Sequence, residues 1–541
     1  MTKIHSAVLD MQSDLRKGKI NRREFLRFAT LLGVSATTAG IMAGCGNQPA
    51  APSTPIPIKR GGTMRIGTAL QEVSHPARLS WVESSNVLRQ VAEYLTETGA
   101  DGITRPWLLE RWEANEDVTM WTLFLNKGIK FNNGQELTAD DVIFNFEQWL
   151  DPTIESSMAT LLSYLSPSNI ERVDDYTIRL HLDAPQIGVP EHLYHYPALI
   201  MSREFEGDFI KQPLGTGPFI LTEYTVGDQA VCQRRPDYWR MGVDGNPLPY
   251  LDELIYIELE VEERVEAMQG GGIDTLYMPS PRDWQVLKEV PNLAVYGVST
   301  AQAFVIRMRV DRPPWDDVRV RQALMLCQDR QRILEGSYFG QGELAIDAHV
   351  APIHPAYCEK PIPKYDPEKA KTLLDEAGYP DGLQVKLITK DDRSEAELAR
   401  ILRNLAAPAG FDIELNTIEP AKYWEQWTEV ELGITHWTHR PLGTMVLALG
   451  YTSDKEGNPV NWNETRWVDE EFNTLLRQAE RTLDIPKRRE IMCQIEEIMQ
   501  TRGPIGISYW RKIWTIIRAE FKNVKMHPTG YDLFYDVWKD T

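Results

Sequence analysis

The chain has 541 residues, enough for about three or four domain-sized units, so we expect a multi-lobed protein. Hydrophobic residues make up 42% and charged residues 25%, which excludes wholesale disorder, a collagen-like fibre and a polytopic membrane protein. The formal net charge is −20, and no basic stripe follows the first 27 residues, so we expect no nucleic-acid partner.

The first 45 residues have the organisation of an export signal. A basic segment over 21–27 leads into a mostly apolar run of small residues over 28–43. This run is shorter than the roughly 20 apolar residues that span a bilayer, so a permanent transmembrane helix is the weaker alternative. The pair Arg22 and Arg23 lies in a segment that resembles a twin-arginine signal. We therefore expect an exported protein.

A lipid-anchor motif and a tether follow this signal. The apolar run ends in Met42-Ala43-Gly44-Cys45, which resembles a lipobox, so we expect lipidation of Cys45. An incidental cysteine beside a small-residue cleavage site is the alternative. The next segment, 46–60, is rich in proline, which predicts a stiff, extended tether. Acyl chains would then hold the protein at a membrane, in the periplasm or on the outer face of the cytoplasmic membrane.

Strand and helix patterns alternate from Gly61 onward, which indicates an α/β or α+β chain. Segments 121–125 and 176–182 are rich in β-branched and aromatic residues, so we predict two strands that pair antiparallel. Thr138 with Asp141 three residues later forms a capping-box pattern. This pattern predicts a helix that begins there.

Four further helices are predicted in the C-terminal half. Apolar residues repeat at helical spacing over 320–327. Asp366 caps a second helix, with proline in its first turn and Gly378 at its end. Similar repeats over 472–479 and 491–499 predict two more helices that face a core.

We find no nucleophile elbow, zinc helix, phosphate loop or dinucleotide fingerprint, so we expect neither an enzyme nor a bound cofactor. The pairs His192/His195 and His436/His439 have a spacing that could hold a transition metal on a helix. Neither pair has a neighbouring cysteine, which favours hydrogen bonding instead. The five cysteines are too few and too scattered for a disulfide framework, and Cys327 falls at a core position of its helix.

Tryptophan is abundant, with 16 residues, and several of them fall in the last quarter of the chain. Aromatic rings give large, rigid contact areas, so a tryptophan-rich cleft suits the capture of a ligand without chemistry. Trp424, Trp437 and Trp462 are our candidates for lining such a pocket. Core packing is the alternative for each of them.

Several separated blocks resemble the extracytoplasmic solute-binding proteins of family 5, which serve peptide, nickel and opine ABC importers. The blocks follow the family's order across most of residues 58–520 and are mostly structural, so they identify the scaffold and not the ligand. They are 61–67, 121–123, 127–134, 137–142, 215–219, 237–239, 272–274, 316–324, 365–370 and 377–379.

The resemblance implies an α/β fold of two lobes, the first with an extra subdomain, that close on a ligand like a hinged clamp. It also implies a permease and an ATPase on other chains as partners. We expect a monomer attached to the membrane through its lipid anchor. The expected organisation is a signal over 1–45, a tether over 46–60, lobe I over 61–302, lobe II over 303–504, ending near Gly503-Pro504, and a return to lobe I over 505–541.

In the peptide-binding members, a Trp-x-x-Asp segment of the second lobe places a carboxylate against the terminal ammonium of the ligand. This chain reads Trp437-Thr438-His439-Arg440. A buried guanidinium binds a carboxylate or phosphate and repels an ammonium, so Arg440, assisted by His439, is our candidate for binding an anionic group. Pairing of Arg440 with an acidic side chain of the protein is the alternative.

The resemblance therefore implies the capture of a peptide or of an opine-like, anionic solute. A nickel- or haem-type metal-binding protein on the same scaffold is an alternative. An exported enzyme or a sensor is another.

Overall fold

A computed structural model describes residues 4–44, 58–391 and 393–540. Cys45, the predicted lipidation site, and most of the predicted tether lie outside the described residues. In the part of the chain that the structure describes, no helix is both long and apolar enough to cross a membrane.

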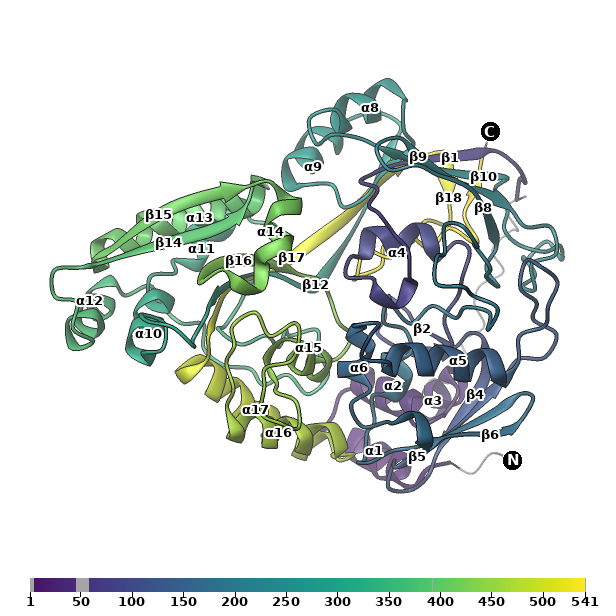
Figure 1. The fold of residues 1–541 in the computed structure, drawn as a ribbon, viewed down its shortest axis with the longest axis horizontal. Coiled ribbons are helices and arrows are strands. Elements are labelled where there is room, and N and C mark those ends of the chain that lie inside the picture. Colours follow the sequence, from purple (N-terminus) through teal and green to yellow (C-terminus); the bar gives the residue numbers. More distant parts are fainter. Residues whose placement is uncertain (1–3, 45–57, 392, 541) are drawn as a thin grey trace. The chain divides into compact units, whose positions relative to one another are not determined.

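The chain forms two compact units. Unit 1 contains Met1–Val298 and Trp514–Thr541, and unit 2 contains Ser299–Ile513. The chain leaves unit 1 within strand β12 (Leu293–Met308) and returns to it within strand β17 (Ile505–Arg518) (Figure 1).

Strand β1 (Thr63–Thr68) lies inside the main sheet of unit 1 because it pairs in parallel with a strand on each side. These neighbours are β10 (Glu253–Glu258) and β11 (Thr275–Leu276). The sheet continues antiparallel from β10 through β9 (Gln229–Arg234) to β8 (Phe219–Tyr224). On the other side, β11 pairs antiparallel with the end of β17, so the C-terminal part of the chain completes this sheet.

A separate antiparallel sheet forms an extra subdomain of unit 1. Its order is β4 (Leu109–Ala114), β5 (Met120–Leu125), β7 (Thr177–His181) and β6 (Ile170–Asp174). Strands β5 and β7 pair directly and antiparallel, which confirms the two predicted strands. Helix α5 (Ala139–Leu150) begins at the predicted capping box.

The other helices and strands of unit 1 after the tether are short. They are α4 (Val82–Leu88), β2 (Thr96–Thr98), β3 (Thr104–Pro106), α6 (Ser157–Leu161), α7 (Val189–His192), α8 (Arg264–Gly270), α9 (Pro281–Leu287), β18 (Phe521–Lys522) and β19 (Trp538–Lys539).

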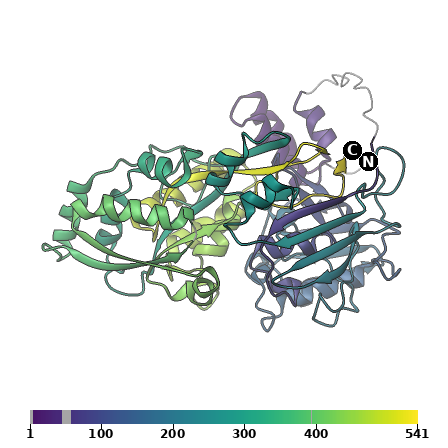
Figure 2. The ribbon, with the colours of Figure 1, turned by 90° about the horizontal axis from the view of Figure 1, so that it is seen from above.

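The N-terminal segment that we predict to be an export signal is helical. It forms α1 (Ser6–Arg16), α2 (Arg22–Leu31) and α3 (Ala36–Met42). Figures 1 and 2 show these helices in purple as part of unit 1. Asn21 caps α2 and accepts a hydrogen bond from the backbone N–H of Glu24, whose side chain accepts one in return. A capping box therefore starts the helix that carries the arginine pair.

The unit 2 sheet has the order β15 (Phe411–Ile418), β14 (Leu383–Lys390), β16 (Leu432–Trp437), β12 and β17. Strand β14 pairs in parallel with both β15 and β16, and β16 pairs antiparallel with β12. Strand β17 also pairs with β13 (Gly342–Leu344). This pairing keeps the chain in unit 2 until Ile513, although a helix already ends before Gly503-Pro504.

Helices flank these strands, and the four predicted helices of this half are confirmed as α10, α12, α16 and α17. Cys327 is fully buried directly after α10, as predicted. The helices are α10 (Val318–Leu326), α11 (Arg330–Tyr338), α12 (Pro367–Glu376), α13 (Arg393–Ala406), α14 (Pro420–Gln426), α15 (Gly443–Tyr451), α16 (Glu470–Arg481) and α17 (Ile485–Arg502).

One disulfide corrects the interpretation of the cysteines. Cys358 and Cys493 are bonded, with their Cα atoms 5.1 Å apart and a sequence separation of 135 residues. Spacing along the chain could not show this pair, because folding alone brings the loop after β13 against α17. Cys232 and Cys327 are buried and free.

Candidate ligand-binding site

Strand β16 positions three of the predicted ligand-binding residues. The strand lies between β14 and β12 and ends at Trp437. His439 and Arg440 follow in the short loop before α15. The side chains of Trp437, His439 and Arg440 are 5%, 5% and 4% exposed, so the loop is packed into unit 2.

The indole of Trp437 is held by other aromatic rings and by a carboxylate. Its Nε1 donates a hydrogen bond to Oε1 of Glu464 at 2.8 Å. Its ring stacks on Tyr451, with centroids 6.4 Å apart, and meets Trp462 edge-on at 6.0 Å. The structure therefore brings the two predicted residues Trp437 and Trp462 together.

A buried ion pair supports this arrangement. Nε of Arg307 lies 3.1 Å from Oε2 of Glu464, and the two side chains are 0% and 2% exposed. The hydroxyl of Thr435 also donates to Oε2 of Glu464, at 2.7 Å. Burial raises the pKa of Glu464, while Arg307 lowers it. Sequence reasoning missed Glu464 because nothing in its neighbours at 463–465 indicates a buried carboxylate.

The loop that carries Arg440 is fixed by hydrogen bonds at both of its predicted residues. Nη1 of Arg440 donates to the hydroxyl of Thr438 and to the carbonyl oxygen of His439, the latter at 3.2 Å. The carbonyl oxygen of Arg440 accepts from Nε2 of His354 at 2.9 Å, and Nδ1 of His439 accepts from the N–H of Ala301 at 3.1 Å. The guanidinium is thus held close to its own loop.

Cationic side chains act on two buried histidines in this part of unit 2. Burial lowers the pKa of His436 well below its usual value, and Arg511, Lys390 and Arg440 lower it further. Burial also lowers the pKa of His349, with smaller contributions from His354 and Arg440. The two imidazoles are therefore neutral, and the cations around them favour an anionic group over a cationic one.

Trp424 lies on α14 in a different aromatic group. Its ring contacts those of Tyr423 and Trp427, with centroids 5.4 and 5.7 Å away. The ammonium of Lys390 lies 4.6 Å from the centroid of the Trp424 ring, and the same ammonium lies 3.2 Å from Glu395. Lys390 therefore connects Trp424 with the cations that surround His436.

The predicted histidine pairs have separate partners. Nδ1 of His192 lies 3.0 Å from the hydroxyl of Tyr164, and Nε2 of His195 lies 3.2 Å from Oγ of Ser157. Nε2 of His436 lies 3.1 Å from Oε1 of Gln302. Among the residues that the structure describes, no group of three or more His, Cys, Asp or Glu side chains is placed to hold a metal ion.

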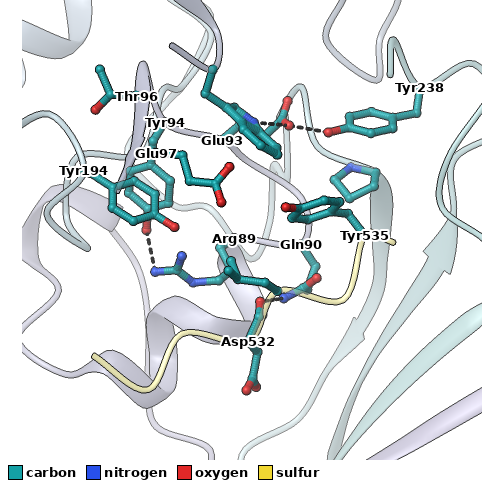
Figure 3. A pocket seen from close by; sticks show the side chains of 13 residues that line it. Arg89, Gln90, Glu93, Tyr94, Thr96, Glu97, Tyr194, Tyr238, Asp532 and Tyr535 are labelled. Carbon is teal, nitrogen blue, oxygen red and sulfur yellow. Dashed lines mark hydrogen bonds between the residues drawn. The ribbon is translucent and has the colours of Figure 1, made fainter. Parts of the chain in front are cut away.

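A pocket lies within unit 1, where the end of α4 meets the C-terminal segment (Figure 3). Glu93 accepts hydrogen bonds from the hydroxyl of Tyr238 at 2.5 Å and from Nε1 of Trp107 at 2.7 Å. Arg89 donates to the hydroxyl of Tyr94 at 3.0 Å and lies over the ring of Tyr531. These contacts connect residues from the N-terminal and C-terminal parts of unit 1.

The comparisons with known proteins agree on one family and one fold. The family described as bacterial extracellular solute-binding proteins, family 5 Middle, matches residues 104–458. Di/tripeptide-binding protein 1 of Pseudomonas aeruginosa is 27% identical over 477 residues, which cover 80% of this chain and 85% of the relative. Heme-binding protein A of Haemophilus influenzae is 28% identical over 497 residues, which cover 84% and 87%.

Two solved structures show the same two-lobed fold. DppA from Helicobacter pylori, in complex with the peptide STSA, has a TM-score of 0.80 at 22% identity and covers 89% of this chain and 99% of its own. AgaA from A. tumefacien R10, in complex with agropinic acid, has a TM-score of 0.80 at 21% identity with the same coverage. The mixed α/β architecture and the extra subdomain thus agree with the predicted fold class.

Proposed function

Since this chain belongs to the bacterial extracellular solute-binding proteins of family 5, we propose that it captures a peptide or an opine-like solute for an ABC importer. The relatives and neighbours named above include proteins for di- and tripeptides, for the peptide STSA and for agropinic acid. Closure of the lobes on the solute is the event that a permease reads, and an ATPase on another chain drives transport. The protein itself acts as a binder and not as a catalyst.

The cationic surroundings of the β16 loop carry the proposal that the solute has an anionic group. Arg440 is buried directly after β16, and Arg511 and Lys390 act on the same neighbourhood as Arg440 does. A guanidinium binds a carboxylate through two parallel hydrogen bonds, so Arg440 is the residue that holds this group. Trp437 and Trp462 provide apolar contact beside it, while Trp424 acts from the side of Lys390.

The proposal also includes the export of the protein and its anchoring to a membrane. Arg22 and Arg23 are exposed at the start of α2, where a translocation machinery can reach them. Lipidation of Cys45 would then anchor the exported protein. The disulfide between Cys358 and Cys493 supports an oxidising compartment, since cytosolic proteins are kept reduced. A Cys45→Ser variant should move from the membrane fraction to the soluble fraction, and unchanged fractionation would contradict the anchor.

Thermal unfolding in the presence of candidate solutes tests the function. The probes are the peptide STSA, the dipeptide Met-Leu, agropinic acid and Ni²⁺, each added to the purified Cys45→Ser chain. A ligand at about 100 times its dissociation constant adds about 2.7 kcal/mol to the free energy of unfolding, which raises the melting temperature measurably. We expect a peptide or agropinic acid to do so. A shift with Ni²⁺ alone would replace the proposal by metal transport.

A further inference from the structure

The predicted export segment is built onto the surface of unit 1. Nε1 of Trp112, on β4 of the extra subdomain, donates a hydrogen bond to the carbonyl oxygen of Leu31 at 2.8 Å. Nε2 of His5 lies 3.1 Å from the carbonyl oxygen of Asn115, just past the end of β4. Helix α2 also contacts β3 and α7 of unit 1. Two separate points of the segment are therefore joined to the same subdomain.

Two glycines show how closely the surfaces approach each other. Gly33 has a φ of +85°, and a Cβ atom there would lie 2.7 Å from the carbonyl oxygen of Trp112. Gly102 lies on the unit 1 side, with a φ of +69°, and a Cβ atom there would lie 1.7 Å from Nη2 of Arg27. Each position therefore needs a residue without a side chain.

Arg27 is the charged anchor of the contact. Its side chain is 4% exposed, and burial together with Arg23 lowers its pKa to about 10. Glu191 on α7 and Asp101 beside Gly102 act in the opposite direction, as nearby carboxylates do. A buried cation with carboxylates of the mature part beside it gives the contact a charge complementarity that random packing of an apolar helix would lack.

The two ends of the signal motif face different surroundings. Arg22 and Arg23 are exposed, whereas Phe25, Phe28 and Leu31 are 0%, 1% and 0% exposed. Helix α1 buries Val8 in the same way, and Nε2 of Gln12 donates to the carbonyl oxygen of Met42 at 2.8 Å, which closes the segment on itself. The arginine pair is therefore exposed to solvent, while the apolar part of the segment is buried.

We propose that the export segment, residues 5–43, is a folded partner of unit 1 in the precursor, and that this contact masks its apolar face until a translocation machinery pulls it away. The chain's own N-terminal segment thus covers the surface around Trp112 and Gly102. Removal of the segment at Cys45 would uncover this surface. The masking role rests on the proposed function of the segment as a signal, whereas the contact itself does not.

Hydrogen exchange of the purified full-length Cys45→Ser chain tests the contact. We expect the backbone amides of 25–33 to exchange at least about 100-fold more slowly than in a synthetic peptide of residues 5–43, because opening them requires undocking. Phe28→Ala should speed this exchange at least about tenfold, as expected for removal of a buried ring. Ile41→Ala is the control, since Ile41 is 60% exposed. Exchange at the peptide's rate would overturn the proposal.

A variant in unit 1, outside the export segment, separates the docking of this segment from its folding. Trp112→Phe keeps an aromatic side chain but removes the indole N–H that donates to Leu31. It should speed exchange of 25–33 about fivefold while the amides of β5 keep their protection. The same variant should accelerate processing of the precursor in cells, and unchanged processing would overturn the masking role. Replacement of Arg22 and Arg23 by Lys should stop export without changing protection. If export continues, the signal assignment fails and the contact stands.

Discussion

Glu464 is the residue on which the geometry of the candidate site depends most. Its carboxylate accepts hydrogen bonds from Trp437 and Thr435 and pairs with Arg307 inside unit 2. A buried carboxylate is stable only when charges and donors surround it, and here the donors include the indole that we expect to touch the solute. The carboxylate therefore fixes the orientation of the Trp437 indole.

Loss of this charge should be costly. Glu464→Gln leaves the Arg307 guanidinium buried without its counter-charge, so we expect the free energy of unfolding to fall by about 3–5 kcal/mol. Urea denaturation measures this. Glu429→Gln is the matched control, because Glu429 pairs with Arg309 but is 57% exposed, and its loss should cost about 0–1 kcal/mol. Equal losses of unfolding free energy in the two variants would show that the buried pair stabilises the protein no more than the exposed pair.

Sequence reasoning reached only part of the candidate site. Arg440 and His439 stood out because they depart from a family pattern, and Trp437 because of its residue type. Arg511, Lys390 and Glu464 act in the same neighbourhood but come from three other segments of the chain. Their proximity follows from the order of strands in the sheet, which no local pattern encodes.

At the scale of elements, the capped helices were predictable. Thr138 with Asp141 and Asp366 with Gly378 fix helix ends by local hydrogen bonds, and the structure has α5 and α12 at these positions. The predicted first crossing at 302/303 lies within β12 and close to the observed change of unit after Val298, whereas β17 was not recognised as the strand in which the chain returns. A strand has no local signal at the point where it leaves one sheet region and enters another. The end of lobe II was therefore predicted at the helix break near Gly503.

The disulfide is the strongest covalent constraint in unit 2. Because it closes a loop of 135 residues, the double variant Cys358→Ala/Cys493→Ala should lose about 2–4 kcal/mol of unfolding free energy. Reductant should destabilise the wild type by a similar amount and leave the double variant unchanged. A reductant effect on the double variant would place the redox sensitivity elsewhere.

Helix α17 carries a buried carboxyl that should make stability depend on pH. Glu496 is 0% exposed and accepts a hydrogen bond from the N–H of Cys358 at 3.1 Å. Burial raises its pKa from 4.5 to about 8, against the smaller opposing effect of Lys360. The folded state therefore binds a proton that the unfolded state has released, so stability falls as the pH rises from about 4.5 to 8.

This pH dependence is tested with a variant that cannot ionise. The free energy of unfolding of Glu496→Gln, measured at several pH values, should exceed that of the wild type by more at pH 8 than at pH 5. Glu490→Gln, at an exposed position of the same helix, is the control and should follow the wild type. A constant difference between Glu496→Gln and the wild type would show that Glu496 is ionised throughout.

At the scale of the whole molecule, separated sequence blocks were sufficient to predict the fold class and the family. Residues 104–458 match the family, and the structure adds the division into two units, each with its own strands and helices. The solute could not be predicted in the same way, because the blocks are structural while specificity depends on a few side chains, of which we propose Arg440 to be one. The central claim is therefore that this guanidinium selects an anionic group.

Calorimetric titration of the Cys45→Ser chain, with and without Arg440→Ala, tests this claim most directly. The probes are STSA as free acid, STSA with an amidated C-terminus, and agropinic acid. We predict that a carboxylate probe binds, that Arg440→Ala weakens it at least about tenfold, as expected for a charged hydrogen bond, and that the amide binds more weakly than the acid. Equal binding of acid and amide, or an effect of Arg440→Ala within about twofold, would contradict the account.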